Sequence, residues 1–532
     1  MIDSLAEKGQ EALKELSKKS QQEINDIVHQ MSMAAVDQHM HLAKLAYDET
    51  GRGIYEDKAI KNLYASEYIW NSIKDNKTVG IIGEDKQKGL TYVAEPIGVI
   101  CGVTPTTNPT STTIFKAMIA IKTGNPIIFA FHPSAQQSSK HAAKVILEAA
   151  IKAGAPKDCI QWIEIPSIEA TKQLMNHKDI ALVLATGGSG MVKSAYSTGK
   201  PALGVGPGNV PTYIEKTAHI KRAVNDIIGS KTFDNGMICA SEQVMVVDKE
   251  IYSDVVKEFK LHHTYFVNKN QLQQLEYAIM NEDKTAVKPD IVGKSAVSIA
   301  KLSGISVPEK TKLLVAEIDG IGKDYPLSRE KLSPVLAMVT AKSTRHALQI
   351  CEDTLNFGGL GHTAVIHTED SQLQQKFGLK MKACRVLVNT PSAVGGIGNM
   401  YNELIPSLTL GCGSYGRNSI SHNVSAVDLL NIKTIAKRRN NMQWFKLPPK
   451  VYFEENSVMY LTEMDNVERV MIVCDPGMVN IGYTDIVEQV LRRRENQPQI
   501  KVFNEVEPNP STHTVYKLSL IHISEPTRQA EI

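Results

Sequence analysis

Residues 97–131 read IGVICGVTPTTNPTSTTIFKAMIAIKTGNPIIFAF, and this stretch decides the fold class. The apolar run 97–103 is typical of a buried strand, and residues 111–121 have the spacing of a helix. A second apolar run follows at 126–131, and a second helical pattern spans 138–153. This order of elements predicts right-handed βαβ units in an α/β fold. Their doubly wound parallel sheet would bind ligands beyond the carboxyl ends of its strands.

The same alternation recurs over residues 224–430. Its apolar runs typical of strands lie at 244–247, 335–339, 364–367 and 386–388, whereas the run at 180–185 belongs to the first set. Before the first strand, residues 1–75 show apolar side chains at near-helical spacing. A second α/β domain, preceded along the chain by N-terminal helices and a doubly wound domain, is the simplest interpretation.

The organisation changes after residue 432. Basic residues followed by Pro448-Pro449 are typical of a linker. An apolar run at 469–474 and a helical pattern at 486–493 then predict the beginning of a partial α/β unit. Residues 518–532 read LSLIHISEPTRQAEI, a pattern unlike the preceding chain that resembles a translated sequencing adapter. We therefore expect the native coding sequence to end near Lys517.

Composition limits the compartment and the partners. With 532 residues, 42% of them hydrophobic and 22% charged, the chain resembles a globular protein of about three domains. A net charge of +2 gives no general attraction to nucleic acid or membranes. Seven cysteines without CxxC spacing argue against a disulfide framework or a zinc site. No signal-peptide pattern and no apolar run near 20 residues is present, so we predict a cytoplasmic protein.

The segment FDNGMICASE, residues 233–242, places a cysteine among small residues. Gly236, Ala240 and Ser241 leave the sulfur of Cys239 approachable, as a nucleophile requires. The alternative is a buried cysteine that packs as a small hydrophobic side chain, which is the more common role. The other motifs of the chain must distinguish the two.

Asn108 lies in the turn TPTTNP, between the first strand and its helix. An amide on such a loop can donate to the oxygen of a carbonyl under attack, as part of an oxyanion hole. It can equally cap the helix that begins near Thr110. The local sequence does not decide between these two roles.

Two glycine-rich turns and one histidine complete the candidates. Thr186-Gly187-Gly188 follows a strand and opens a helix, which would present N–H groups to a phosphate. Residues 204–209, GVGPGN, could admit a flat ligand or form a tight bend. His362 in GGLGHT could exchange protons near neutral pH, although a lone histidine is more often structural.

Together these stretches resemble one family, the CoA-acylating aldehyde dehydrogenase half of the bifunctional aldehyde–alcohol dehydrogenases of fermentation. The resemblance covers about residues 1–445 and is carried by six strings: AEPIGVICGVTPTTNPTSTTIFKAM, LATGGSGMVKSAYSTGKPALGVGPGNVP, SKTFDNGMICASEQ, REKLSPVLAM, GGLGHT and SLTLGCGSYGRNSIS. It continues through PKVYFEENSV, IVCDPGMV and NEVEPNPST, which are similar to the start of the iron-dependent alcohol dehydrogenase half.

The resemblance implies a role for each candidate. Cys239 would be the nucleophile, Asn108 would share the oxyanion with the Cys239 amide, and His362 would assist CoA chemistry. Glu330 would hold the nicotinamide ribose of NAD(H). The further cofactor-binding residues would be Thr104, Pro105, Thr106, His132, Pro133, Thr186, Gly187, Gly188 and Gly206.

Two positions depart from other aldehyde dehydrogenases. Hydrolytic members carry a general-base glutamate in the turn before the cysteine, whereas residues 201–214 contain no carboxylate. Without that base a thiol such as CoA can attack the thioester in place of water. Ala135 stands where many NAD-preferring relatives have a glutamate, so the expectation of NAD rests on the subfamily resemblance.

The resemblance therefore implies an acetylating acetaldehyde dehydrogenase with the aldehyde dehydrogenase fold. It would reduce acetyl-CoA to acetaldehyde reversibly with NADH, and would form homo-oligomers or filaments. The alternatives are a hydrolytic aldehyde dehydrogenase and a non-catalytic filament subunit. Residues 450–517 contain one histidine, His513, too few for an iron site. We therefore expect no metal and no alcohol dehydrogenase activity in this chain.

These expectations assign five segments to the chain. Residues 1–223 would hold the N-terminal helices and the NAD-binding domain, joined by a return segment near 390–432. Residues 224–389 would form the catalytic domain. The remaining segments are a linker at 433–449, a partial α/β unit at 450–517 and a non-native tail at 518–532.

Overall fold

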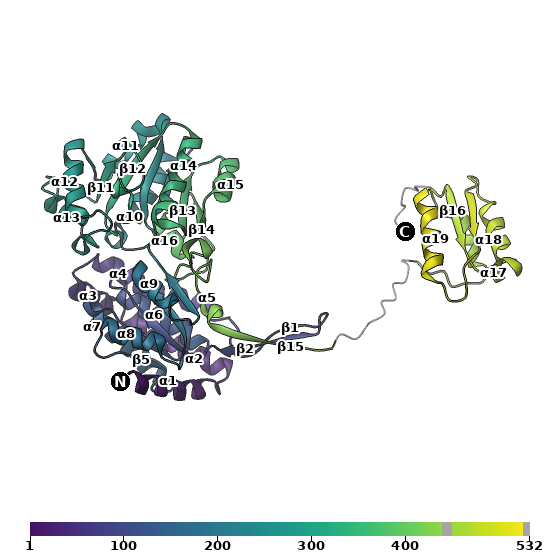
Figure 1. The fold of residues 1–532 in the computed structure, drawn as a ribbon, viewed down its shortest axis with the longest axis horizontal. Coiled ribbons are helices and arrows are strands. Elements are labelled where there is room, and N and C mark those ends of the chain that lie inside the picture. Colours follow the sequence, from purple (N-terminus) through teal and green to yellow (C-terminus); the bar gives the residue numbers. More distant parts are fainter. Residues whose placement is uncertain (439–449, 525–532) are drawn as a thin grey trace. The chain divides into compact units, whose positions relative to one another are not determined.

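The computed structural model describes residues 1–438 and 450–524, apart from the side chains of residues 189 and 521–524. The chain divides into two compact units, residues 1–438 and residues 439–532. The first unit holds sheets of five, seven and three strands, and the second holds a sheet of two (Figure 1). The predicted α/β class with parallel sheets is confirmed. The expected linker lies largely outside the described residues.

The predicted N-terminal helices are present. They are α1 (Ile2–Leu16), α2 (Gln21–Asp37), α3 (His39–Thr50), α4 (Tyr55–Leu63) and α5 (Ile69–Ile73). A capping box between Ser20 and Glu23 begins α2, and Gly51 ends α3 in the left-handed conformation at φ 59°. The buried faces of α2 and α5 share one hydrophobic core with α6 and α7.

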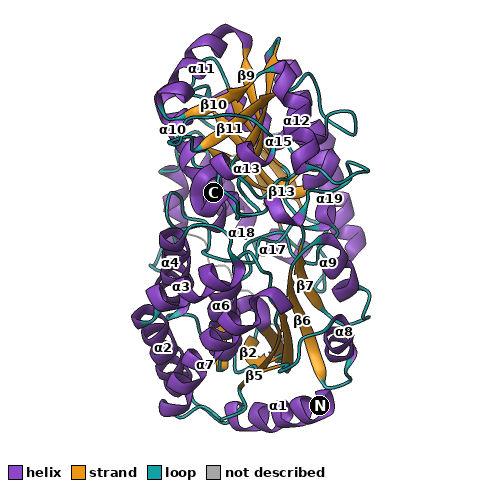
Figure 2. Ribbon diagram, turned by 90° about the vertical axis from the view of Figure 1, so that its left-hand side faces the viewer, coloured by secondary structure: helices purple, strands orange, loops and turns teal. Residues whose placement is uncertain are grey.

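The five-stranded sheet has the order β5-β4-β3-β6-β7, and its strands are all parallel. Its strands are β3 (Val99–Val103), β4 (Ile127–Ala130), β5 (Ile160–Trp162), β6 (Ile180–Thr186) and β7 (Ala202–Val205). Its helices are α6 (Pro109–Lys122), α7 (Gln136–Lys152), α8 (Ile168–Asn176) and α9 (Ser189–Tyr196). Ile100 is buried in the same core as α6 and α7, whereas Val99 and Cys101 are buried in a second core that includes residues of α8. In Figure 2, α6 and α7 lie to one side of the strands of this sheet and α8 lies to the other. The strand order reverses beside β3, the point where such sheets bind ligands.

The seven-stranded sheet is also parallel, in the order β10-β11-β12-β9-β8-β13-β14. Its strands are β8 (Val210–Ile214), β9 (Glu242–Asp248), β10 (Thr264–Val267), β11 (Leu313–Glu317), β12 (Val335–Ala341), β13 (Gly361–His367) and β14 (Ala383–Val388). Its helices are α10 (Ile220–Thr232), α11 (Tyr252–Leu261), α12 (Lys269–Ile279), α13 (Ala296–Leu302), α14 (Thr344–Thr354), α15 (Ser371–Lys380) and α16 (Ser392–Ile397).

The chain passes between the two sheets earlier than the expected boundary at residue 223. The strand β8 pairs with β9 and β13, so the crossing lies in the turn between β7 and β8. The sequence does not reveal this crossing, because β7 and β8 are both short apolar strands separated by a glycine-rich turn. That turn therefore spans the two sheets, which matters for the site below.

A three-stranded antiparallel sheet was not expected from the sequence. It joins β1 (Gly80–Asp85), β2 (Leu90–Pro96) and β15 (Leu430–Ala436). The segment after β14 returns to the first core, where Leu410, Val424 and Leu429 are buried. Residues 433–436, expected to begin the linker, belong to β15 and pair with β2.

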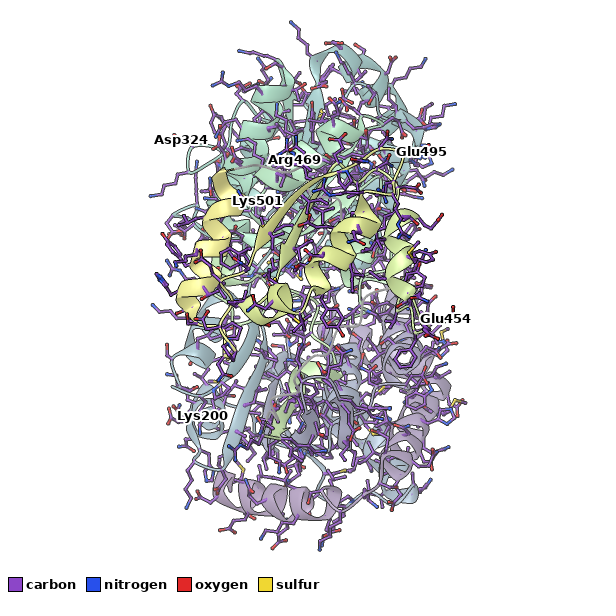
Figure 3. All side chains as sticks on the ribbon, turned by 90° about the vertical axis from the view of Figure 1, so that its right-hand side faces the viewer. Lys200, Asp324, Glu454, Arg469, Glu495 and Lys501 are labelled. Atoms are coloured by element: carbon purple, nitrogen blue, oxygen red, sulfur yellow. The ribbon has the colours of Figure 1, made fainter. Side chains whose placement is uncertain are left out.

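The second unit contains the predicted strand and helix of a partial α/β unit. Its strands β16 (Arg469–Val473) and β17 (Gln499–Phe503) are parallel, with Met471 opposite Lys501. Its helices are α17 (Pro476–Asn480), α18 (Tyr483–Leu491) and α19 (Thr512–Ser524), and Figure 3 labels Arg469 and Lys501 on the strands. The expected tail begins inside α19, and residues 525–532 lie outside the described residues.

Candidate active site

A cavity of about 800 Å³ lies in the first unit, at the ends of β3, β4, β6 and β7 and against the loop that carries Cys239. All the predicted site residues except His362 line it. These are Thr104, Pro105, Thr106, Asn108, His132, Pro133, Thr186, Gly187, Gly188, Gly206, Cys239 and Glu330. The structure thus brings together residues from six separate stretches of sequence, and the site lies at the predicted edge of the first sheet.

The loop before Cys239 has an unusual backbone. Asp234 and Asn235 have positive φ angles of 47° and 52°, and Gly236 follows at 76°. A Cβ on Gly236 would lie 2.8 Å from the carbonyl oxygen of Ser333, so glycine is required there. The side chain of Asn235 donates to the carbonyls of Gly53 and Gly293, which fixes the turn. These contacts fix the backbone of the loop that carries Cys239.

Cys239 is half-buried in this cavity and has no disulfide partner. Burial raises the pKa of its thiol to about 12, and the carboxyl group of Glu330 adds to the rise. The guanidinium of Arg385 acts in the opposite direction. The thiol is consequently protonated near neutral pH, so its attack must be coupled to loss of a proton.

Asn108 occupies the N-cap position of α6, yet its side chain makes no capping hydrogen bond. The capping alternative left open by the sequence is therefore wrong. Its Oδ1 accepts a hydrogen bond from Lys61 Nζ at 2.6 Å. Its Nδ2 lies 3.3 Å from Thr107 Oγ1, and both residues line the cavity. The amide nitrogen is thus the end available to an oxygen in the cavity.

Glu330 and Cys239 are joined through Gly208. The Gly208 N–H donates to Glu330 Oε1 at 3.1 Å, and a Cβ on Gly208 would lie 2.2 Å from the Cys239 carbonyl oxygen. Burial raises the pKa of Glu330 to about 7, against the lowering effect of Lys231 and Lys331. The glycine-rich turn between β7 and β8 thereby contacts both the Glu330 carboxyl group and the backbone of Cys239.

His362 lies behind the cavity wall rather than in it. The ring is fully buried, and a Cβ on Gly208 would lie 3.0 Å from its Cγ. Nδ1 is 3.0 Å from Thr363 Oγ1, and Nε2 has no hydrogen-bond partner within the described chain. Burial holds the pKa of the ring well below its ordinary value. Its catalytic role stays a prediction beside the structural alternative.

The side of the cavity nearest the five-stranded sheet has unpaired polar groups and open space beside its glycines. The Oγ1 atoms of Thr104 and Thr186 are buried without a hydrogen-bond partner among the described residues. Gly188 is the N-cap of α9, and a Cβ on Gly188 or Gly206 would meet no atom within 4 Å. Unpaired hydroxyl groups, open glycines and a helix N-terminus fit the phosphates and hydroxyls of a dinucleotide. We call these residues, with Gly187, the cofactor wall.

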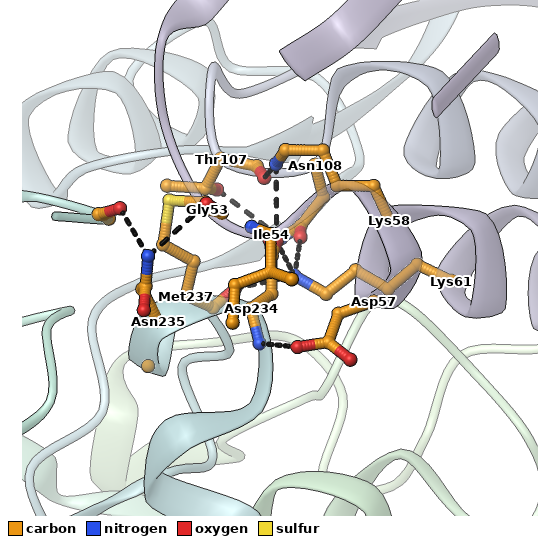
Figure 4. A network of polar contacts seen from close by, with 12 residues as sticks. Gly53, Ile54, Asp57, Lys58, Lys61, Thr107, Asn108, Asp234, Asn235 and Met237 are labelled. Carbon is orange, nitrogen blue, oxygen red and sulfur yellow. Dashed lines mark hydrogen bonds and ion pairs between the residues drawn. The ribbon is translucent and has the colours of Figure 1, made fainter. Parts of the chain in front are cut away.

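Sequence reasoning missed the charged residues behind Cys239 and Asn108. Lys58 and Lys61 of α4 both contact the fully buried carboxylate of Asp234 (Figure 4). No local motif marks them, because they are two ordinary lysines of an amphipathic helix far from the cysteine in sequence. We call Lys61, Asn108 and Cys239, which line the cavity, together with Asp234 behind them, the catalytic wall.

The described residues show neither a metal-binding cluster nor a membrane-spanning helix. Within residues 1–438 and 450–524, no group of three or more His, Cys, Asp or Glu side chains is arranged to hold a metal ion. None of the helices in these ranges has the length and apolar character needed to cross a bilayer.

Comparison with known proteins agrees with this geometry. The profile described as "Aldehyde dehydrogenase family" matches residues 1–399. This chain belongs to the aldehyde dehydrogenase family. An aldehyde-alcohol dehydrogenase of Streptococcus pneumoniae is 55% identical over 491 residues, covering 91% of this chain and 56% of the relative. One from Entamoeba histolytica is 52% identical, covering 97% of this chain and 60% of the relative. The chain therefore spans under two thirds of these relatives.

Solved structures extend the comparison to the acylating enzymes. An acetylating aldehyde dehydrogenase from Geobacillus thermoglucosidasius superposes with a TM-score of 0.81 at 47% identity, covering 84% of this chain and 98% of that one. A propionaldehyde dehydrogenase of Rhodopseudomonas palustris, with bound CoA and an acylated cysteine, gives 0.73 at 27% identity, covering 82% and 97%. The resemblance stated from the motifs is confirmed.

Proposed function

We propose that this chain reduces acetyl-CoA to acetaldehyde reversibly with NADH, as a CoA-acylating acetaldehyde dehydrogenase. The observation that carries the proposal is the cavity in which Cys239 and Asn108 meet a carboxylate-free turn. Relatives and structural neighbours named as acetylating aldehyde dehydrogenases support the reaction class. A nicotinamide dinucleotide would lie on the cofactor wall, with Glu330 beside its ribose.

The first half-reaction exchanges one thioester for another. Cys239 Sγ attacks the carbonyl carbon of acetyl-CoA, and Asn108 Nδ2 donates to the oxygen as it gains negative charge. The bond from carbon to the sulfur of CoA then breaks. CoA leaves as a thiol with the proton that Cys239 has lost, which leaves the acetyl group on the enzyme.

The second half-reaction reduces the enzyme thioester. Reduced nicotinamide, when bound, supplies a hydride to the carbonyl carbon. Asn108 again faces the oxygen, which takes up one proton from water as the thiohemiacetal forms on Cys239, and this proton passes to the sulfur when the carbon–sulfur bond breaks. Breaking the carbon–sulfur bond releases acetaldehyde and returns the thiol. The raised pKa of Cys239 assists this last step, because the sulfur takes up a proton readily.

The hydrolytic alternative needs a base to activate water. Residues 205–208 supply backbone and apolar groups only, and Glu330 is the one carboxylate among the described residues that line the cavity. Its Oε1 already accepts the Gly208 N–H. Water should therefore attack the thioester slowly, which leaves the thioester to CoA.

The remaining assignments rest on the resemblance. They are NAD in preference to NADP, assembly into homo-oligomers or filaments, a cytoplasmic location, and the division of the chain into a cofactor domain and a catalytic domain. A non-catalytic subunit is disfavoured because Cys239 and Asn108, the proposed nucleophile and oxyanion donor, line the same cavity.

The test is product stoichiometry with the purified chain. With acetyl-CoA and NADH, one free CoA thiol should appear for each NADH oxidised. In the reverse direction acetaldehyde and NAD⁺ should yield acetyl-CoA only when CoA is present. Acetate formed at a comparable rate without CoA would support the hydrolytic alternative and contradict the proposal.

A further inference from the structure

The ammonium group of Lys61 lies where three segments of the catalytic wall meet. Its Nζ donates to Asp234 Oδ2 at 2.5 Å, to Asn108 Oδ1 at 2.6 Å and to the Met237 carbonyl at 3.1 Å (Figure 4). An ammonium group has three N–H donors, and these three acceptors match that number. The side chain is 4% exposed and contributes to the lining of the cavity.

This contact determines which end of the Asn108 amide faces the cavity. Lysine can only donate, so the amide atom that faces Nζ at 2.6 Å must be the carbonyl oxygen. A reversed amide would place two donors against each other and would turn an acceptor toward the developing oxyanion. Lys61 therefore selects the one orientation in which Nδ2 is available for catalysis.

The same ammonium group is held in place by a buried carboxylate. Asp234 is fully buried, and its Oδ1 accepts the Ile54 N–H at 2.7 Å. Its own N–H donates to Asp57 Oδ2 at 2.7 Å. Through its side chain and its backbone N–H, Asp234 therefore connects the loop of Cys239 to α4 and to the residue that precedes this helix. Lys61 thereby links the nucleophile's loop to Asn108.

Lys58 provides a comparison within the same cluster. Its Nζ donates to the same Asp234 Oδ2 at 3.2 Å and to the Thr107 carbonyl at 3.4 Å. Within the described residues, Lys58 makes no hydrogen bond with the Asn108 side chain, and it is as buried as Lys61. The two lysines therefore share the carboxylate but differ in the amide contact.

We propose that Lys61 is a positioning residue for the reaction, which holds the Asn108 amide nitrogen toward the reacting carbonyl and fixes it relative to Cys239. The inference rests on the proposed role of Asn108 as the oxyanion donor. On this proposal the helix α4, through Lys61, orients the Asn108 amide in addition to packing against its neighbours.

The test compares Lys61→Met with Lys58→Met in the full chain. Each variant leaves Asp234 with one ammonium partner, so both should lower the melting temperature to a similar extent. Lys61→Met should lower kcat for acetyl-CoA reduction about 10- to 100-fold with the KM for NADH within about twofold, since misplacing one group by an ångström has such an effect. Lys58→Met should lower kcat less than about threefold.

A double-mutant cycle with Asn108→Ala separates orientation from general damage. Asn108→Ala alone should lower kcat about 10²- to 10³-fold, as loss of one oxyanion donor does. Adding Lys61→Met to it should then cost less than about threefold, because no amide remains to be oriented. Lys61→Gln, which keeps an N–H donor, should retain more activity than Lys61→Met and replaces it in the cycle if that variant does not fold.

The possible results separate the positioning role of Lys61 from the proposed function of the chain. If Lys61→Met loses the same factor with and without Asn108, or if Lys58→Met loses as much, the positioning role is wrong and the proposed function stands. Equal loss in the Gln and Met variants at position 61 would also overturn it. If Asn108→Ala keeps full kcat, the oxyanion role fails and the positioning role fails with it. CoA-dependent turnover by the parent chain would still support the proposed function.

Discussion

The two walls of the cavity differ in how completely their polar groups are satisfied. On the cofactor wall, Thr104 and Thr186 carry buried hydroxyl groups without partners among the described residues, and the glycines leave open space. On the catalytic wall, Asp234 accepts from two buried lysines and a backbone amide. The hydroxyl groups of the cofactor wall therefore remain available to hydrogen-bond a ligand. The polar groups of the catalytic wall bond one another instead, which would hold the proposed reacting groups in place before a substrate binds.

The largest effect should follow from removing the nucleophile. Cys239→Ala deletes the sulfur that forms both covalent intermediates, so kcat in either direction should fall by about 10³-fold or more. Cofactor affinity, measured by NADH fluorescence, should stay within about twofold because the cofactor wall is untouched. A loss of less than about tenfold would show that another residue attacks.

Breaking the internal bonds of the catalytic wall should destabilise the chain. Asp234→Ala leaves Lys58 and Lys61 as buried ammonium groups without their carboxylate, and a broken buried ion pair of this kind costs about 3–5 kcal/mol in the free energy of unfolding. Chemical denaturation followed by fluorescence measures this loss. A change below about 1 kcal/mol would mean that this wall is not internally fixed as described.

The charge of Glu330 should be visible in the reactivity of the thiol. The carboxylate raises the pKa of Cys239, so Glu330→Gln should lower that pKa and increase the thiolate fraction at a given pH. Alkylation by iodoacetamide at pH 8 should become about 3- to 10-fold faster, since one pKa unit is a factor of ten. In the parent chain the alkylation rate should rise with pH throughout the range 6–9, because the thiol titrates near 12.

Two results of the alkylation experiment would contradict this prediction. An unchanged alkylation rate in a folded Glu330→Gln protein would show that the two groups do not interact. A rate that reaches a plateau below pH 8 in the parent chain would show that the thiol is already ionised there.

The smallest effect should come from the cofactor wall, with opposite signs for stability and binding. Thr186→Val replaces a buried hydroxyl group that has no partner, so the ligand-free chain should gain about 1 kcal/mol of stability. The affinity for the dinucleotide should fall about 3- to 10-fold because the hydroxyl is lost as a hydrogen-bonding group. Thermal melts with and without NADH measure both. Destabilisation of the ligand-free chain would show that the hydroxyl is satisfied internally.

The same contrast explains what the sequence could and could not predict. The parallel strands and the positions of Cys239, Asn108 and Glu330 follow from local signals, namely apolar runs, turns and recognisable motifs. Lys61 contacts Asp234 across 173 residues, and nothing in the helical pattern of α4 distinguishes that lysine from its exposed neighbours. The placement of His362 behind Gly208 also required the structure, because GGLGHT reads alike for a lining and a buried histidine.

The antiparallel sheet was missed for a different reason. The strands β1, β2 and β15 are partly exposed, so their apolar content does not mark them as strands. In addition, β15 follows β2 only after more than three hundred residues, so the sequence does not predict that these two strands pair. The second unit was easier, because its strand and helix alternate within a short segment.

On the proposed mechanism, the acetyl thioester on Cys239 forms quickly and is hydrolysed slowly. Rapid mixing of the purified chain with acetaldehyde and NAD⁺, without CoA, tests it directly. We expect a burst of about one NADH per chain, followed by slow NADH formation. Addition of CoA should then restore fast turnover, with acetyl-CoA as the product. Continuous NADH formation at the full rate without CoA, with acetate as the product, would contradict it.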